Sequence, residues 1–432
     1  MSPGSLRRAA WRWHFYAGLI VLPMLLWLAA TGALYLYKPE IEAWLYAKWS
    51  HVEPAARPMR LDAMIATVER QSGGKVRQVM RPAASDASWR MSLAMPGGGK
   101  RLAFVDPYRG TLLGSVAGGG AMATVKDLHS LAITGPIGNA LVEIVAGWAI
   151  VLVVTGLWLW WPRRGSPVVA LRGKPSGRLF WRDLHAAVGL FGGGVILFLA
   201  LTGMPWTGVA GKSLQAWVAD HGLGRPAAGA YSVGGHAGHA MGAESLPWSM
   251  QATPPPANLA HGGRASAQQS AEAAAWAGLA APWTLTLPVA PGAPYQFSAA
   301  IVRAEDAHVV AIDSASGREL RDVRYWGFGA GARWIEWGIA AHQGQQYGEP
   351  NRLVMLFGCL ALWALALTGP LLWWKRRNGR GLAAPPAADS RSPRVVAALM
   401  LALGLLLPLT GITMIAALAG EQLWRRLERL IA

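Results

Sequence analysis

The stretch T-G-L-W-L-W-W-P-R-R at residues 155–164 recurs as T-G-P-L-L-W-W-K-R-R at residues 368–377. Both copies end an apolar run with two adjacent tryptophans, one further residue and two arginines. A histidine precedes each copy at the same distance, because His129 and His342 each lie 26 residues before the threonine. A repeat with identical spacing predicts that the chain contains an internal duplication.

A second pair of stretches extends the duplication toward the N-terminus of each copy. His14 lies 17 residues before Thr31, and His185 lies 17 residues before Thr202, with a glycine after each threonine. Each copy therefore predicts a helix, an external domain and a helix, in the same orientation, as in a parallel repeat. A further apolar stretch carries a Thr-Gly pair at Thr410 but no histidine.

The composition is that of a membrane protein. Hydrophobic residues make up 53% of the 432 residues and charged residues only 15%, against about 25% in soluble domains. Five apolar stretches reach the roughly 20 residues that a bilayer-spanning helix needs: 15–37, 136–161, 186–209, 353–374 and 395–418. We predict an α-helical membrane protein with five transmembrane helices, built on a duplicated two-helix unit, with two small external α+β lobes.

The net charge of +17 lies mostly in short segments between the predicted helices. Basic residues cluster in residues 1–12, 162–184 and 375–394. Because cytoplasmic loops are rich in Lys and Arg, we place these segments, and the N-terminus, in the cytoplasm. The charge is then an orientation signal, and no nucleic-acid partner is expected. The first apolar run is too long for a signal peptide, so we expect a retained anchor.

This topology divides the chain into consecutive segments. They are a cytoplasmic N-terminus with the first helix (1–37), a first external lobe (38–126), a histidine-bearing approach to the second helix with that helix (127–161), a basic loop (162–184), the third helix (185–210), a second external lobe (211–335) with a flexible insertion (221–265), a histidine-bearing approach to the fourth helix with that helix (336–374), a basic loop (375–394), the fifth helix (395–418) and an external tail (419–432).

The two external segments predict corresponding folded lobes. The first predicts a helix at 61–71, strands at 76–80, 89–95 and 101–105, and a turn at 106–110; the second predicts a helix at 267–279, strands at 283–287, 295–302 and 308–312, and a turn at 313–317. Each turn has an aspartate followed by a glycine four residues later, a combination that favours a tight turn.

The four repeated histidines are the candidate ligands. His14 and His185 begin helices at the cytoplasmic face, and His129 and His342 precede helices at the external face, so residues at equal depth pair across the two copies. Two histidines on facing helices suit bis-imidazole ligation of a b-type haem, whereas a tetrahedral zinc or copper site would lack ligands. The only cysteine, Cys359, excludes covalent haem attachment through C-x-x-C-H.

Several other residues are also candidates for a functional or a structural role. Gly18 and Gly189 lie one turn after a histidine and either admit a flat porphyrin or serve close helix packing. Glu143 has Leu356 at the corresponding place in the second copy, and it serves protons, a quinol or a polar contact. Asp127 and Asp183 are expected as helix N-caps. A further set, in the flexible insertion, either binds copper or iron or belongs to a polar loop: His236, His239 and Met241.

At these motifs the chain resembles the PepSY-associated transmembrane family, also called iron-regulated membrane proteins. The resemblance rests on the His-x3-Gly-Leu start at His14, the Leu-His pair ending at His129, the Thr-Gly-to-Arg-Arg exit at 155–164 and the Asp-Pro-x-x-Gly turn at 106–110, and it covers about residues 8–378. Ala341 stands before His342 where that family usually has leucine, and the second turn lacks proline.

The resemblance implies a di-haem reductase of ferric siderophores in the bacterial inner membrane. Electrons would pass from the cytoplasm or the quinol pool to a chelate docked between the external lobes, near His129 and His342. A regulator of a peptidase, as other PepSY proteins suggest, and a periplasmic metal-handling protein are the alternatives. The sequence holds no hydrolase motif such as G-x-S-x-G or H-E-x-x-H.

Overall fold

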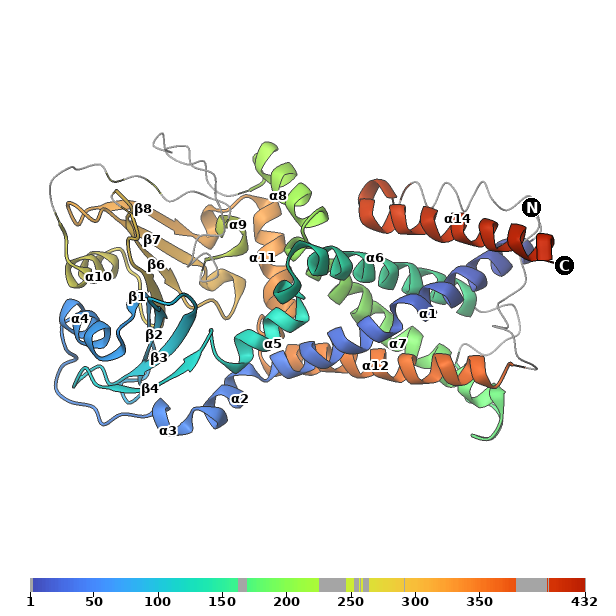
Figure 1. Ribbon diagram of the computed structural model, residues 1–432, viewed down its shortest axis with the longest axis horizontal. Coiled ribbons are helices and arrows are strands. Elements are labelled where there is room, and N and C mark those ends of the chain that lie inside the picture. Colours follow the sequence, from blue (N-terminus) through green and yellow to red (C-terminus); the bar gives the residue numbers. More distant parts are fainter. Residues whose placement is uncertain are drawn as a thin grey trace.

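The computed structural model describes residues 3–161, 169–224, 246–251, 256, 258, 264–290, 292–377, 402 and 404–431. A bundle of long helices occupies one end of the molecule, and an antiparallel sheet with short helices occupies the other (Figure 1). The arrangement matches the expected division into spanning helices and external segments.

Four described helices are long and apolar enough to cross a membrane. They are α1 (Pro3–Leu36), α6 (Gly135–Trp160), α7 (Arg178–Gly203) and α12 (Glu349–Trp374). Helices α6 and α12 begin alike, with a proline in the first turn, where its missing N–H costs nothing. The glycines Gly135 and Gly348 at these starts have positive φ angles of 67° and 66°, which turn the chain into each helix.

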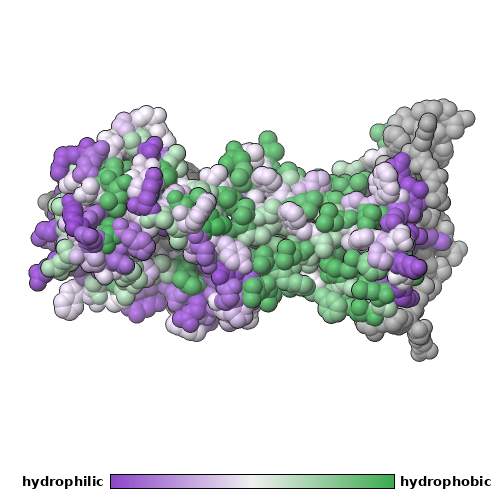
Figure 2. Space-filling model, turned by 90° about the horizontal axis from the view of Figure 1, so that it is seen from below, coloured by the Kyte–Doolittle hydropathy of each residue, from purple (hydrophilic) through white to green (hydrophobic). Residues whose placement is uncertain are grey.

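The surface of the bundle has the pattern of a bilayer-spanning protein. Figure 2 shows apolar side chains over the helical part, between the polar sheet domain and a second polar band at the opposite end. Large apolar side chains stay exposed on the helices, including Ile20 at 56%, Phe191 at 64% and Leu360 at 58%. A broad exposed apolar surface bounded by polar ends indicates contact with lipid.

The predicted fifth span is not confirmed. Residues 378–401 lie outside the described residues, and helix α14 (Pro408–Ile431) has a continuous apolar part of only Pro408–Gly420. Helix α14 packs along α6 and ends beside the N-terminus (Figure 1). The predicted external position of the tail at 419–432 is therefore not confirmed.

The two predicted lobes form one eight-stranded antiparallel sheet, in the order β4-β3-β2-β1-β5-β6-β7-β8. The first copy supplies β1 (Lys75–Arg81), β2 (Trp89–Ala94), β3 (Lys100–Val105) and β4 (Leu112–Ala117), and the second supplies β5 (Trp283–Thr286), β6 (Tyr295–Ala299), β7 (His308–Ile312) and β8 (Glu319–Arg324). Strands β1 and β5 join the copies through four residue pairs, Gln78 with Thr286 among them. The lobes are thus one folded unit.

Two equivalent helices cover the outer face of this sheet. Helices α4 (Leu61–Ser72) and α10 (Ala267–Trp276) pack on a core that contains Phe297 and Ile312, both fully buried. Each helix also caps the other, since Asp62 accepts the N–H of Ala267 at 2.8 Å and Gln268 accepts the N–H of Leu61 at 3.0 Å. Reciprocal capping satisfies N–H groups that a helix start leaves without partners.

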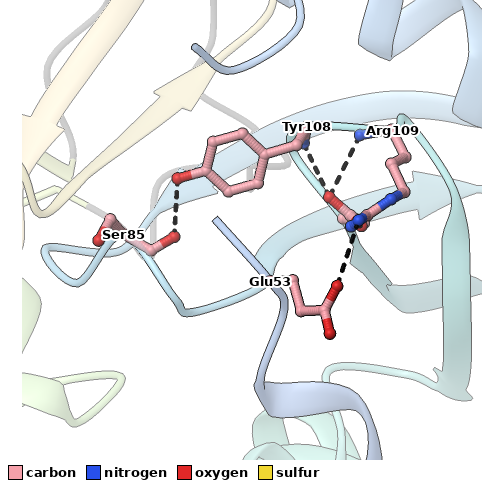
Figure 3. A network of polar contacts seen from close by, with 5 residues as sticks. Glu53, Ser85, Tyr108 and Arg109 are labelled. Carbon is pink, nitrogen blue, oxygen red and sulfur yellow. Dashed lines mark hydrogen bonds and ion pairs between the residues drawn. The ribbon is translucent and has the colours of Figure 1, made fainter. Parts of the chain in front are cut away.

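The predicted aspartate turns have the same geometry in both copies. Asp106 Oδ1 accepts N–H hydrogen bonds from Tyr108 and Arg109, at 2.8 and 3.2 Å, and Arg109 also reaches Glu53 (Figure 3). Asp313 Oδ1 accepts equivalent bonds from the second and third residues after it, at 2.7 and 3.2 Å. The glycine four residues after each aspartate has a positive φ angle, 67° and 75°, as the turn requires.

Short helices join the sheet to the bundle, and the sequence did not predict most of them. They are α2 (Lys38–Leu45), α3 (Ala47–Ser50), α5 (Ala121–His129), η1 (Ala132–Thr134), η2 (Met204–Trp206), α8 (Ala210–Asp220), α9 (Trp248–Gln251), η4 (Ala304–Asp306), η5 (Tyr325–Gly327) and α11 (Ala330–His342). Helices α5 and α11 each end on a candidate histidine, which places His129 and His342 at the end of the bundle that adjoins the sheet domain.

Candidate functional site

Each of the four histidines contacts a threonine of a Thr-Gly pair. In the first copy, His14 Nδ1 lies 3.0 Å from Thr155 Oγ1, and His129 Nδ1 lies 2.9 Å from Thr31 Oγ1. The second copy repeats both contacts: His185 with Thr368 at 2.7 Å and His342 with Thr202 at 2.9 Å. Both copies of the duplicated sequence thus contain the same two histidine–threonine hydrogen bonds.

The threonine hydroxyls determine which imidazole nitrogen carries the proton. Each hydroxyl donates to the carbonyl four residues earlier in its own helix, as Thr31 does to Trp27 at 2.8 Å and Thr202 to Phe198 at 2.6 Å. A hydroxyl has one proton to donate, so each Oγ1 accepts from the histidine. The histidine Nδ1 then carries the proton, and Nε2 keeps a free lone pair, as a metal ligand requires.

The glycine after each threonine provides space for the imidazole. A Cβ atom on Gly156 would lie 3.1 Å from His14 Cε1, and one on Gly32 would lie 3.3 Å from His129 Cε1. The corresponding distances in the second copy are longer, 3.9 Å from Gly369 to His185 and 3.7 Å from Gly203 to His342. The Thr-Gly pair therefore combines a hydrogen-bond acceptor with a bare backbone surface for the ring.

His14 and His185 lie side by side, as their equal depth predicts. Their ring centroids are 6.3 Å apart, and their planes are perpendicular. An imidazole–metal bond is about 2 Å long, so a metal between two imidazoles separates the ligating nitrogens by about 4 Å and the ring centroids by more. The observed spacing leaves room for one metal ion between the two rings.

His129 and His342 are neighbours at the end of the bundle that adjoins the sheet domain. Burial lowers the pKa of both groups, and the neighbouring His129 lowers that of His342 further, to about 4. The lowered pKa favours the neutral imidazole, the state in which histidine ligates a metal.

The two pairs lie near opposite ends of the spanning helices. We call His14 and His185 the inner pair, or inner level, and His129 and His342 the outer pair, or outer level. Helix α1 carries His14 at the inner level and Thr31 at the outer level, and 17 residues of helix span about 25 Å. Among the described residues, no group of three or more His, Cys, Asp or Glu side chains could hold a metal ion. Each level thus offers two imidazoles from two helices, a donor set that fits the axial positions of a haem iron.

Gly18 and Gly189 occupy equivalent places between helices. A Cβ on Gly18 would lie 3.8 Å from Leu152 Cδ2, and one on Gly189 would lie 3.8 Å from Leu365 Cδ2. These are ordinary packing distances, so the described neighbours of both glycines are helix side chains. Their role beside a porphyrin stays a prediction.

Glu143 has a structural contact that the sequence did not specify. Its side chain is fully buried, and Oε2 accepts the N–H groups of Val209 and Ala210 at 3.0 and 3.1 Å, at the start of α8. The other oxygen, Oε1, has no hydrogen-bond partner among the described residues. The predicted reading as a polar contact is supported, and its proton or quinol role stays a prediction.

The expected N-caps are wrong, because both aspartates lie within helices and not before their first turns. Asp127 lies near the end of α5, and Asp183 lies inside α7, where it forms ion pairs with Arg172 and Arg182 at 2.9 and 2.7 Å. The candidate metal residues His236, His239 and Met241 lie outside the described residues.

The Thr-Gly pairs are visible in the sequence, but their pattern alone predicts no function. Their recurrence at four equivalent positions was the available signal, and only the structure pairs each threonine with a histidine. The fifth pair, at Thr410, has no histidine partner: Thr410 is fully buried against Gly147, and its hydroxyl has no hydrogen-bond partner among the described residues.

Comparison with protein families gives one match. A family model described as PepSY-associated TM region matches residues 11–376, a range that includes all four histidines and the whole sheet. A search of curated proteins found no match to this chain.

Proposed function

Because the chain belongs to the PepSY-associated transmembrane family, we propose that it is a bacterial inner-membrane electron-transfer protein that reduces a ferric siderophore on the periplasmic side. It would hold two noncovalent b-type haems, one between His14 and His185 and one between His129 and His342. Haem iron supplies reversible one-electron chemistry when bound in this way.

One observation carries this proposal: two histidine pairs at two depths, each with Nε2 left free by a threonine. A single buried histidine in a helical bundle would be explained by a polar contact. Four histidines with the same hydrogen bond, two at each level, match the needs of two bis-imidazole sites. The levels are about 25 Å apart along the helices, which distributes the sites across most of a bilayer core of about 30 Å.

The membrane-facing side of the sheet is the proposed docking surface for the ferric chelate. The outer side is covered by α4 and α10, and the other faces the bundle end that holds His129 and His342 (Figure 1). Strand pairing places polar side chains together at the centre of this inner face: Gln78, Ser92, Thr284, Thr286 and Gln296. Since the two lobes form one sheet, docking on this shared face replaces docking between separate lobes.

The protein's own groups then have three tasks. The apolar helices exclude water from the inner pair, the threonines hold the imidazoles in the ligating tautomer, and the sheet holds the chelate near the outer pair. One electron converts the chelated iron(III) to iron(II), which binds hard oxygen donors less strongly. The donor would be a cytoplasmic reductant or a membrane quinol.

The test is the reoxidation of the purified, dithionite-reduced protein by a ferric trihydroxamate, followed at the absorbance of the reduced cofactor. We expect stoichiometric reoxidation together with capture of iron(II) by a ferrous chelator. Replacing Gln78 and Thr286 by leucine should slow reoxidation by the chelate but not by ferricyanide. Reoxidation by ferricyanide alone, with none by the chelate, would contradict the proposed substrate, and a peptidase regulator would retain its activity without the four histidines.

A further inference from the structure

The four threonines contact the histidines on the side away from the free nitrogen. Building on the haem function proposed above, we propose that Thr31, Thr155, Thr202 and Thr368 are positioning residues that set the reduction potentials of the two haems. Each would act through the Nδ1–H of its histidine rather than by touching the iron.

The physical basis is the direction of the hydrogen bond. The threonine proton is committed to a helix carbonyl, at 2.6 Å for Thr155 and 2.8 Å for Thr368, so the oxygen accepts from the imidazole. An accepted Nδ1–H bond makes the imidazole a stronger electron donor, which favours iron(III) over iron(II). Removing the acceptor should therefore raise the potential.

The arrangement of the threonines is crossed between the levels. Helix α1 supplies the ligand His14 to the inner pair and Thr31 to the outer pair, and α7 does the same with His185 and Thr202. The inner histidines take their threonines from α6 and α12. A threonine substitution should therefore affect the haem at one level only, because the histidine on the same helix belongs to the other level.

The chain contains a matched control. Thr410 belongs to a fifth Thr-Gly pair on α14, and it is fully buried but contacts no histidine among the described residues. Thr410→Val removes a buried hydroxyl of the same kind from a bundle helix. It should leave both potentials unchanged.

The experiment is a spectroelectrochemical titration of the full-length, haem-loaded protein and its variants. Thr31→Val and Thr202→Val should each raise the reduction potential of the haem at the outer level. Thr155→Val and Thr368→Val should each raise the reduction potential of the haem at the inner level. Loss of such a partner changes metal affinity about 10- to 100-fold; a tenfold change in relative affinity for the two iron states corresponds to about 59 mV. The serine variants should restore the original potentials, because serine keeps the hydroxyl.

Several results distinguish this inference from the proposed function. A wild-type protein without haem would overturn the proposed function itself. A wild-type protein with two haems, whose valine variants keep both potentials or shift them no more than Thr410→Val does, would overturn the inference alone. Loss of haem from a valine variant only at the level of the substituted threonine, with haem retained in the serine variant, would support the inference. Equal loss of haem from the valine and serine variants would contradict it.

Discussion

The imidazole rings of His14 and His185 lie with their centroids 6.3 Å apart and their planes perpendicular, although the two residues are 171 positions apart in the chain. Each ring is held from behind by a threonine of the partner helix in its own copy. The contact between the copies is therefore a contact between two imidazoles that are each bound to a threonine.

Removal of one ligand should empty one level and leave the other occupied. We expect His129→Ala and His342→Ala each to reduce the haem content from two to one per chain, and His14→Ala and His185→Ala to do the same at the inner level, because a bis-imidazole site needs both rings. The haem-to-protein ratio measures this directly. His308→Ala is the control, since His308 pairs with Asp322 on the sheet and should not affect haem content; a loss there would contradict the assignment.

Alanine at the Thr-Gly glycines should have graded effects. A Cβ on Gly156 would approach His14 to 3.1 Å, whereas one on Gly369 would stay 3.9 Å from His185. We expect Gly156→Ala to weaken haem binding at the inner level by about tenfold, the lower end of the range for disturbed ligand support, and Gly369→Ala to leave it nearly unchanged. Haem transfer to apomyoglobin measures the difference. Equal effects of the two variants would show that the glycines do not seat the rings.

Glu143 should stabilise the start of α8 through its two N–H contacts. Glu143→Leu, which copies Leu356 of the second copy, leaves the N–H groups of Val209 and Ala210 without their acceptor, at a cost of about 1–3 kcal/mol for a buried unpaired group. Glu143→Gln keeps an accepting oxygen and should cost less. Thermal unfolding in detergent compares them, and a leucine variant as stable as the wild type would refute the contact. A proton role would instead slow quinol oxidation in the stable Glu143→Gln variant.

The Asp106 turn should make the sheet domain sensitive to acid. Although burial acts in the opposite direction, hydrogen bonds from the Arg109 side chain and from the Tyr108 and Arg109 N–H groups lower the pKa of Asp106 (Figure 3). A lowered folded-state pKa gives stability that is present at neutral pH and lost as the pH falls through that pKa. Asp106→Asn should flatten this dependence below pH 4 in thermal unfolding. An unchanged acid profile would contradict the role of the carboxylate.

The sequence predicted the duplication, the four spanning helices and three strands of each lobe. These features depend on local pattern, because apolar length defines the spans and the repeated histidines and threonines fix the register. The pairing of β1 with β5 was not predictable, since it joins residues about 200 positions apart and leaves no local signal. Strands β4 and β8 were missed because they follow the turns without strong alternation.

The candidate site was predicted in part. Depth alone gave the histidine pairs, and ring contact supports the pairing of His14 with His185. The threonine partners were not predicted, because a Thr-Gly pair in an apolar helix equally indicates helix packing. The N-cap role predicted for Asp183 is wrong for a different reason: α7 starts at Arg178, before the apolar run that defined the predicted helix.

The most direct test of the central claim is the haem content of the purified full-length chain, by pyridine haemochrome assay and by the difference between reduced and oxidised absorbance spectra. We predict two b-type haems per chain, both with the low-spin spectrum of two axial histidines. A protein purified from haem-replete cells that shows no Soret band and takes up no added haem would contradict the account.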